Sequence, residues 1–412
     1  MPSDAAMHEL CELIVDCPHS TPKWSDAGVL VLRSHNIRGG RLDLSDKSFT
    51  DESTYKLRSR RAELRGRDLV ITREAPMGEV SMIPSGLRCC LGQRMVLLRP
   101  DESKCDAGYL LYAIQAPLVQ NQIAWSEGTG STVSNLRIPH LEALRVPTPS
   151  LADQRAIAAV LGSLDDKIEQ NRRTGRKLEE LARAVFKAWF VDFEPVKAKA
   201  AGATAFPGMP PETFASLPNT LKDSPLGPVP EGWEAGTLDD VLQLQRGFDL
   251  PKAQRVEGPH PIYAASGVNG WHNESRVKGP GVTTGRSGVL GNVFFADRDF
   301  WPLNTSLWVK EYMRSNPWHA YYLLQTVGLD RFNAGSAVPT LNRNHLRGVI
   351  VVMASEALLD AFATLCGGMF DLLQQLEAES AMLATIRDYL LPRLLSGRVR
   401  VGENSSTGRG TM

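Results

Sequence analysis

An apolar heptad repeat over residues 150–193 constrains the fold of this chain more than any other feature of its sequence. Apolar side chains recur every seventh residue and at the positions between, and one polar, thin layer interrupts them: Ile157, Leu161, Leu164, Ile168, Leu178 and Val185, with the interruption at Asn171 and Gly175. This is the pattern of a helix that packs along a partner helix. Ser150, with Asp153 three residues later, predicts the N-cap of a helix about 60 Å long at 1.5 Å per residue.

The partner helix is predicted within the same chain. A second heptad series follows further on: Phe362, Cys366, Met369, Leu373, Leu376, Leu383 and Leu390, with Ser380 in its thin layer. Phe362 stands 205 residues after Ile157, and Ser380 stands 205 residues after Gly175. Two heptad series with the same spacing indicate a duplicated helix.

The duplication extends beyond the two helices. GSTVSNLRIPHL begins at Gly130 and GSAVPTLNRNHL begins at Gly335, again 205 residues apart. Upstream, VITREAPMGEVSMIP near Val70 resembles VTTGRSGVLGNVFFAD near Val282, and each predicts two strands around a turn of small residues. A helix is also predicted over residues 109–124, with a break at Pro117.

We therefore predict an α+β fold with two mixed α/β domains. Two long helices, packed as an antiparallel coiled coil, separate these domains and give an internal pseudo-two-fold repeat. The stretch 195–231 is rich in Pro, Ala and Gly and is predicted to be a linker that holds no helix. The expected segments are the first domain (1–149), the first helical region (150–194), the linker (195–231), the second domain (232–354), the second helical region (355–400) and a disordered tail (401–412).

Composition narrows the class of protein. The formal net charge is zero, so any nucleic-acid surface must be a local basic face. No apolar run approaches the ~18 residues of a membrane span, and the N-terminal residues lack the basic start of a secretion signal. The six cysteines lack metal-ligand spacing and are interpreted as reduced thiols, which predicts a cytoplasmic protein without a metal site.

Catalytic signatures are missing from the sequence. It has no phosphate-binding G-x-x-x-x-G-K-[ST] loop and no H-E-x-x-H pair. The Gly-rich GRSGVLG, from Gly285 to Gly291, lies between two predicted strands rather than before a helix, so it does not fit a dinucleotide site. His140 and His345, a repeat pair, are expected to satisfy a hydrogen bond where each domain meets its helix. The chain is predicted to be non-catalytic and to bind no cofactor itself.

Local positive charge is the remaining functional signal. Arg and Lys side chains neutralise phosphates, and Arg, Asn, Ser and Thr can contact base edges. The candidate DNA-binding residues lie in five loops or strand ends: Arg33, His35, Asn36 and Arg38; Arg60 and Arg61; Thr72 and Arg73; Ser266 and Asn269; and Thr284, Arg286 and Ser287. For the basic stretch from Tyr55 to Arg73, a solvated helix face is an equally good interpretation.

Several segments resemble one known family, the specificity (S) subunits of type I restriction-modification systems. LADQRAIAAVLGSLDDKIEQNRR and LEELARAVFKAWFVDFEPVKAKA are similar to the central conserved region of that family. VDCPHSTPKW near the start, PEGWE before the second domain and LLPRLLSGRVRV near the end also resemble it, so the likeness covers residues 8–402. The opening of the second helix, SEALLDAFATLCG, departs from the family pattern.

The resemblance implies two target-recognition domains, each of which reads one half of a bipartite, asymmetric double-stranded DNA target. It implies that the helices bind two methyltransferase (M) subunits, with Gln154, Arg155, Trp189 and Phe190 as candidate contacts, Trp189 and Phe190 because exposed aromatic residues favour a partner. Restriction-translocation (R) subunits would join them, and S-adenosylmethionine, ATP and Mg would be bound by these partner subunits. Two alternatives remain: a stand-alone DNA-modifying enzyme with divergent motifs, and a coiled-coil scaffold without a DNA role.

Overall fold

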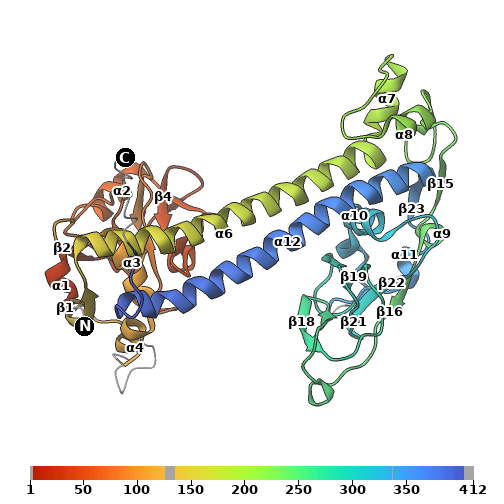
Figure 1. Cartoon of the computed structure of the whole chain (residues 1–412). Coiled ribbons are helices and arrows are strands. Elements are labelled where there is room, and N and C mark those ends of the chain that lie inside the picture. Colours follow the sequence, from red (N-terminus) through yellow and green to blue (C-terminus); the bar gives the residue numbers. More distant parts are fainter. Residues whose placement is uncertain (1–2, 126–134, 336, 403–412) are drawn as a thin grey trace, which may run out of the picture. The chain divides into compact units, whose positions relative to one another are not determined.

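The computed structural model describes residues 3–125, 135–335 and 337–402 of the chain (Figure 1). The chain forms two compact units: unit 1 comprises residues 1–172 and 377–412, and unit 2 comprises residues 173–376. Each unit holds one globular part and a stretch of both long helices, α6 (Leu151–Phe186) and α12 (Glu356–Leu395). The predicted tail lies almost entirely outside the described residues, and so do Gly130 and Val133 of the repeated motif.

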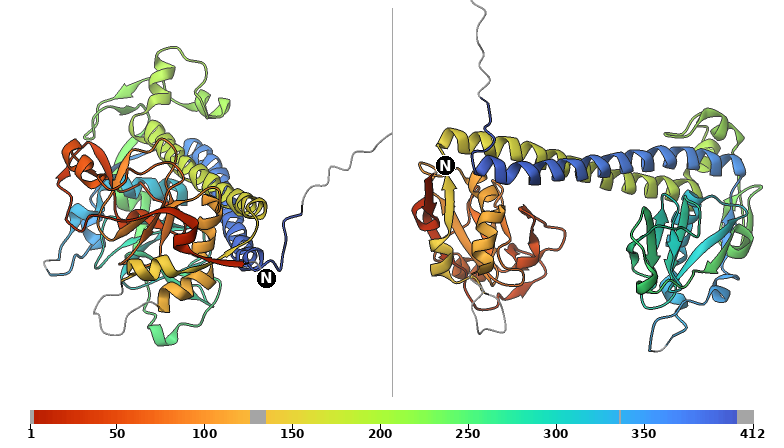
Figure 2. Two further views of the ribbon diagram at one scale, coloured as in Figure 1. Left: turned by 90° about the vertical axis from the view of Figure 1, so that its left-hand side faces the viewer. Right: turned by 60° about the horizontal axis from the view of Figure 1, so that its bottom comes forward.

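Within each unit, α6 and α12 lie side by side and run antiparallel (Figure 2). In unit 1, Arg387 Nη1 donates to Asp165 Oδ1 at 2.8 Å, and Asn171 Nδ2 donates to Ser380 Oγ at 3.3 Å. Residue numbers that rise along α6 therefore meet numbers that fall along α12. Ser150 Oγ accepts a hydrogen bond from the Asp153 N–H at 3.2 Å, which confirms the predicted N-cap. The heptad pattern predicted both helices correctly.

The globular part of unit 1 is built on two four-stranded sheets. One sheet is antiparallel throughout, with the order β2 (Cys11–Asp16), β11 (Met95–Pro100), β8 (Leu69–Thr72) and β9 (Val80–Met82). The other has the order β10 (Cys89–Leu91), β4 (Val29–Leu32), β7 (Ser48–Thr50) and β3 (Trp24–Ser25). Two strand pairs complete it: β1 (Ser3–Ala6) with β12 (Arg145–Thr148), and β5 (Ile37–Arg38) with β6 (Arg41–Leu42).

Short helices cover these sheets: α1 (Met7–Leu10), the 3-10 turn η1 (Ser34–Asn36), α2 (Glu52–Arg58), α3 (Ala107–Gln115), α4 (Pro117–Trp125) and α5 (Ile138–Ala143). The side chain of Asp106 accepts from the Tyr109 N–H at 2.9 Å and caps α3. A new helix begins at Pro117, which confirms the predicted break, because proline lacks the N–H that would continue α3.

The globular part of unit 2 has an antiparallel sheet of the same order: β16 (Leu242–Arg246), β22 (Ser306–Tyr312), β19 (Gly281–Gly285) and β20 (Val293–Ala296). Its other strands form a three-stranded sheet and two pairs: β18 (Gly267–His272), β17 (His260–Ala264) and β21 (Trp301–Pro302); β15 (Glu234–Thr237) with β23 (Ile350–Met353); and β13 (Leu221–Lys222) with β14 (Val229–Pro230). The helical elements are the π-helical turn η2 (Lys187–Val191), α7 (Glu194–Ala200), α8 (Pro211–Ser216), α9 (Leu238–Val241), η3 (Lys252–Gln254), α10 (Pro317–Val327), η4 (Leu329–Phe332) and α11 (Arg343–Leu346).

The predicted internal repeat is confirmed by the matching topology of the two units. Each globular part contains a strand, a four-residue helix and a second strand in succession: β1, α1 and β2 in unit 1, and β15, α9 and β16 in unit 2. The first strand of each set pairs antiparallel with the strand that precedes a long helix, β12 or β23. The second strand is the edge of the matching four-stranded sheet in both units.

The expectation that residues 195–231 hold no helix is wrong. This stretch carries most of α7 and all of α8, and the side chains of Val196, Phe214 and Val229 are buried in the hydrophobic cluster of unit 2. Pro195 and Pro211 lie in the first helical turn, where a missing N–H costs no hydrogen bond. Burial of apolar side chains therefore stabilises short helices that composition alone did not indicate.

Candidate nucleic-acid interface

An internal ion pair dominates the strand ends of unit 1. Asp16 ends β2, and Arg73 follows β8 directly. Arg73 Nη1 donates to both carboxylate oxygens of Asp16, at 2.9 and 2.8 Å, and Arg73 Nε donates to the Leu136 carbonyl oxygen at 2.9 Å. Both side chains are mostly buried. Arg73 was a predicted DNA contact, but the structure gives its guanidinium three internal hydrogen bonds.

The Arg33–Arg38 loop of unit 1 divides into exposed and buried members. Asn36 is buried and its amide donates to the carbonyl oxygens of Asp43 and Asp46, both at 2.9 Å, while its oxygen accepts from the Arg33 N–H at 2.9 Å. Asn36 therefore holds the loop together and is corrected from a DNA contact to a structural residue. Arg33 and Arg38 are exposed.

His35, in the same loop, is half-buried. Its Nε2 lies 3.2 Å from the Asp46 carboxylate. The two exposed arginines of the loop, and not His35, are thus its most accessible polar groups.

The basic stretch after α2 also divides. Arg58 is buried and donates to three carbonyl oxygens: its Nε to Leu91 at 2.7 Å, its Nη1 to Ser20 at 2.9 Å and its Nη2 to Pro18 at 3.0 Å. This burial lowers the pKa of the Arg58 guanidinium. Arg60 and Arg61 are exposed, so they remain candidate phosphate contacts.

Two predicted threonines are buried at the strand ends of their sheets. The Thr72 hydroxyl oxygen accepts from the Glu79 N–H at 3.0 Å, and the Thr284 hydroxyl donates to the Asn292 carbonyl oxygen at 2.7 Å. Their side chains close the β8–β9 and β19–β20 turns. Both are therefore corrected from DNA-binding candidates to structural residues.

A basic groove lies at the strand ends of unit 2. It has a volume of about 760 Å³, and its polar lining comes from β16, the loop after β19 and the start of α11: Gln245, Arg246, Asp249, Arg286, Thr340, Asn342 and Arg343. Three arginines thus face one aspartate. We call it the unit 2 groove. Of its lining, sequence reasoning had singled out Arg286 alone.

Two of the three arginines in the unit 2 groove are held by hydrogen bonds, and the third is not. Arg286 Nη1 donates to the Asn304 carbonyl oxygen at 3.0 Å, and Arg343 Nη1 donates to the Leu244 carbonyl oxygen at 3.4 Å. Arg246 is exposed and makes no side-chain hydrogen bond or ion pair to any residue within the described ranges. The groove therefore presents guanidinium groups that pair with no carboxylate of the described residues, which suits phosphate or base acceptors.

The remaining predicted residues of unit 2 lie at its surface. Ser266 and Asn269 are exposed at the β17–β18 turn, where Arg255 Nη1 donates to Asn269 Oδ1 at 3.0 Å. Ser287 follows Arg286 and is half-buried. The structure thus keeps Ser266, Asn269, Arg286 and Ser287 accessible, and their contact with DNA stays a prediction.

The candidate partner residues on α6 and η2 are mostly internal. Gln154 is buried, with its oxygen accepting from the Asp106 N–H at 2.9 Å and its amide donating to the Pro149 carbonyl oxygen at 3.0 Å. Trp189 and Phe190 are 2% and 7% exposed and pack on Phe362 in the core of unit 2, so their expected exposure is wrong. Arg155 is exposed and remains a candidate.

An exposed apolar stripe on α12 in unit 1 was missed by sequence reasoning. Met382, Ile386 and Tyr389 are 66%, 40% and 57% exposed and stand four and three residues apart, on one helix face. Their spacing is readable in the sequence, but the heptad assignment drew attention to the buried face. A contiguous exposed apolar stripe is typical of a protein-binding surface.

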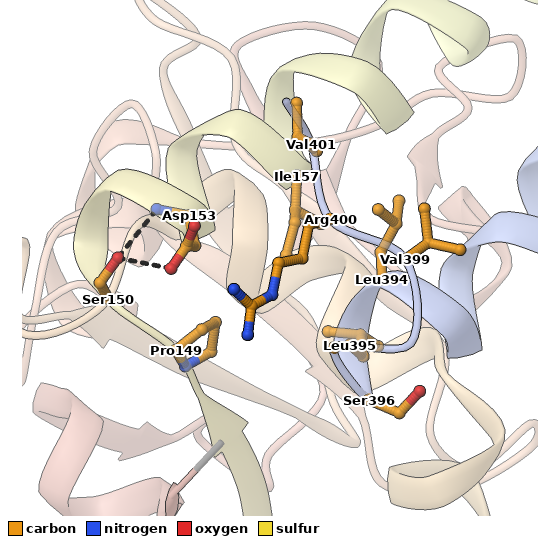
Figure 3. A pocket seen from close by; sticks show the side chains of 11 residues that line it. Pro149, Ser150, Asp153, Ile157, Leu394, Leu395, Ser396, Val399, Arg400 and Val401 are labelled. Atoms are coloured by element: carbon orange, nitrogen blue, oxygen red, sulfur yellow. Dashed lines mark hydrogen bonds between the residues drawn. The ribbon is translucent and has the colours of Figure 1, made fainter. Parts of the chain in front are cut away.

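A second hollow, of about 420 Å³, lies in unit 1 between the start of α6 and the residues that follow α12 (Figure 3). Ile157, Leu394 and Val401 supply apolar walls, and the Arg400 side chain reaches toward Pro149. The Ser150 hydroxyl donates to the Asp153 carboxylate at 2.7 Å on its rim. These groups cap and pack the helix and form no acid–base or nucleophile pair.

Neither the thiols nor the acidic residues form a reactive cluster. Burial raises the pKa of Cys11, Cys89 and Cys366 to about 12, so these thiols stay protonated at neutral pH. Over the ranges that the structure describes, no three His, Cys, Asp or Glu side chains gather as metal ligands would. None of the described helices combines the length and apolar character that a bilayer crossing requires.

Comparison with known proteins shows which proteins this chain is similar to. Residues 47–180 match the family model described as the type I restriction modification DNA specificity domain. The chain is 24% identical over 364 residues to the type I restriction enzyme MjaIX specificity subunit of Methanocaldococcus jannaschii, and the match covers 81% of this chain and 78% of that protein. The chain is thus similar to type I specificity subunits over most of its length. These matches confirm the resemblance seen in the sequence.

Two further likenesses agree with that family. The HindI specificity subunit of Haemophilus influenzae is 22% identical over 339 residues, which cover 66% of this chain and 73% of that subunit. The crystal structure of a type I S subunit from M. genitalium has the same fold, with a TM-score of 0.59 and 18% identity over 95% of both chains. Specificity subunits are parts of larger restriction enzymes, and this agrees with the prediction of a non-catalytic subunit.

Proposed function

We propose that this chain is the DNA sequence-recognition subunit of a type I restriction-modification complex, in which unit 1 and unit 2 each read one half of a bipartite, asymmetric duplex target. The repeated topology of the two units carries the proposal, because two equivalent domains suit a target with two half-sites. Their surfaces differ at equivalent positions, which suits two different half-sites. Exposed arginines in both units supply groups that can bind phosphates and base edges.

The proposal assigns the chemistry to other subunits. Methyltransferase subunits would bind S-adenosylmethionine, restriction-translocation subunits would bind ATP and Mg, and this chain would bind no cofactor. The apolar stripe of Met382, Ile386 and Tyr389 supports docking of a methyltransferase subunit, because burying it would remove exposed apolar area from water. A cytoplasmic location is part of the same proposal, since the DNA target and the partner subunits would be met there.

Exchange of one domain tests the function. Residues 232–354 are replaced, in the full chain, by the corresponding domain of another specificity subunit, and methylated adenines are mapped in cells that contain the methyltransferase subunits. One half of the methylated sequence should change and the other half should stay. If both halves changed, the assignment of one half-site to each unit would be wrong.

The two alternatives give different results. A stand-alone modifying enzyme would methylate or cleave DNA as the purified chain without partners. A scaffold without a DNA role would leave DNA binding by the assembled complex unchanged when the domain is exchanged or deleted. A recognition subunit should instead give binding that weakens steeply with salt, because its arginines release counterions from DNA.

A further inference from the structure

The strand registers align the two four-stranded sheets residue by residue. Val96 on β11 pairs with Asp16 on one side and with Ile71 on the other. Leu307 on β22 pairs in the same way with Arg246 and with Thr284. Asp16 and Arg246 are therefore equivalent, and each is the last residue of its strand.

A separate observation aligns the two arginines that follow the neighbouring strands. Arg73 stands two residues after Ile71, and Arg286 stands two residues after Thr284. The carbonyl oxygen of Arg73 accepts from the Leu136 N–H at 3.0 Å, and that of Arg286 accepts from the Leu341 N–H at 2.8 Å. Leu136 and Leu341 are themselves a repeat pair, so Arg73 and Arg286 occupy equivalent positions.

The equivalent pairs differ in net charge: the pair in unit 1 is neutral, and the pair in unit 2 is positive. Unit 1 has an aspartate beside an arginine, and Asp16 and Arg73 neutralise each other at 2.8 Å. Unit 2 has an arginine at both positions, Arg246 and Arg286, and Arg343 joins them in the lining of the unit 2 groove. Where unit 1 has Asp16 and a closed ion pair, unit 2 has Arg246 and an open, cationic groove.

We infer that Arg246 binds a backbone phosphate of the half-site read by unit 2, and that unit 1 lacks this contact because Asp16 takes its place. The inference rests on the proposed function. It adds that phosphate contacts contribute more to the binding of the half-site read by unit 2 than to the binding of the other half-site. The groove lies at the strand ends of its sheet, and its volume of about 760 Å³ exceeds that of a phosphate group.

The held and the free arginine have different roles. A guanidinium that reads a base must be positioned, and Arg286 is positioned by its bond to the Asn304 carbonyl oxygen. Arg246 is exposed and has no partner among the described residues, so it supplies charge without a fixed orientation. Phosphate offers oxygens in several directions, so it suits such a donor better than a base edge, whose acceptors lie in one plane.

The test measures duplex binding by the full chain, assembled with its methyltransferase subunits, as a function of salt. Arg246→Gln is compared with wild type and with Lys222→Gln, which removes an exposed charge of unit 2 that does not line the groove. Loss of one phosphate contact should make the slope of log K against log salt shallower by about 0.9. Between 0.1 and 1 M salt, the affinity of wild type should therefore fall about eightfold more than that of Arg246→Gln. Arg246→Asp should weaken binding further, because the new carboxylate pairs with Arg286 as in unit 1.

Three outcomes are distinguishable. An equal loss for all duplex sequences with a smaller salt slope supports the inference. An unchanged slope, or a loss confined to one base position of the target, overturns it, and the second result assigns Arg246 to base reading. The proposed function itself would be contradicted if the wild-type complex bound the sequence that it methylates no better than a scrambled duplex.

Replacing single charged phosphates with a neutral group locates the phosphate that Arg246 contacts. A methylphosphonate is placed at single positions in the half-site that domain exchange assigns to unit 2. At one such position the methylphosphonate should lower the affinity of the wild-type complex. It should cause no further loss of affinity in Arg246→Gln, which already lacks the contact. If, at every position in that half-site, the methylphosphonate weakened binding by Arg246→Gln as much as binding by wild type, the contact would be ruled out. The Arg246 side chain is exposed and contacts no side chain of the described residues by hydrogen bond or ion pair, so the variant should fold normally. An unchanged circular dichroism spectrum checks this.

Discussion

His319 makes the stability of unit 2 depend on acid. It lies on α10, is 2% exposed, and packs against the rings of Phe190 and Phe186 at centroid distances of 4.8 and 5.6 Å. Its Nδ1 lies 2.8 Å from the Ser315 hydroxyl oxygen. Burial lowers the pKa of the His319 imidazole from 6.5 to about 3, because the charged ring would lose its hydration.

The sign and size of the effect follow from these two pKa values. Below pH 6.5 the unfolded chain binds a proton at this histidine while the folded chain does not, so the free energy of unfolding falls as pH falls toward 3. Between pH 7.5 and pH 4.5 the loss from this one group is about 2 to 3 kcal/mol. Above pH 7 the contribution is constant.

Urea unfolding at several pH values measures this loss. Six of the eight tryptophans lie in unit 2, so tryptophan fluorescence mainly reports its unfolding. His319→Asn keeps a side-chain polar group near Ser315 but does not titrate. This variant should be less stable at pH 7.5 and should lose about 2 to 3 kcal/mol less than wild type on going to pH 4.5. Equal losses in the two proteins would refute the assignment to His319.

Three further predictions concern unit 1. Arg58→Leu leaves three carbonyl oxygens without their donor and should lower the free energy of unfolding by about 3 to 5 kcal/mol, whereas Arg60→Leu, at an exposed position, should change it by less than about 0.5 kcal/mol in the same urea titration. Asp165→Ala removes the acceptor of two arginines and a tyrosine and should cost about 3 kcal/mol by thermal unfolding; a change below about 0.5 kcal/mol would contradict the importance of this network. Met382→Asp combined with Tyr389→Asp should lower affinity for a methyltransferase subunit at least about tenfold in native mass spectrometry, without loss of stability in the free chain, and unchanged assembly would remove the stripe as a docking surface.

Periodicity predicted the elements that are stabilised along a single line of contacts. The heptads of α6 and α12 extend over many turns, so each apolar position repeats the same information. The linker prediction failed for the opposite reason. α7 and α8 are short, and Val196 and Phe214 stabilise them through contacts with residues distant in sequence, which composition does not record.

Site residues were harder to predict because charge is visible in a sequence but ion pairing is not. Arg58, Arg73 and Arg246 look alike in sequence, yet the first two are held internally and the third faces solvent. The equivalence of Asp16 and Arg246 was also hidden. These residues are 230 positions apart, whereas the helices repeat at 205, because the connections in the two units differ in length. Only the strand pairing shows that the two positions correspond.

The division of the chain has a consequence for its synthesis. Leu391, Leu394 and Leu395 belong to the same hydrophobic cluster as Met7 and Leu10, and all of unit 2 is encoded between them. A ribosome that adds 5 to 20 residues per second spends about 10 to 40 s on those residues. During that interval the earliest part of the nascent polypeptide has an unfinished core, whereas the later, contiguous part can close as soon as it emerges. The segment made first is therefore completed last.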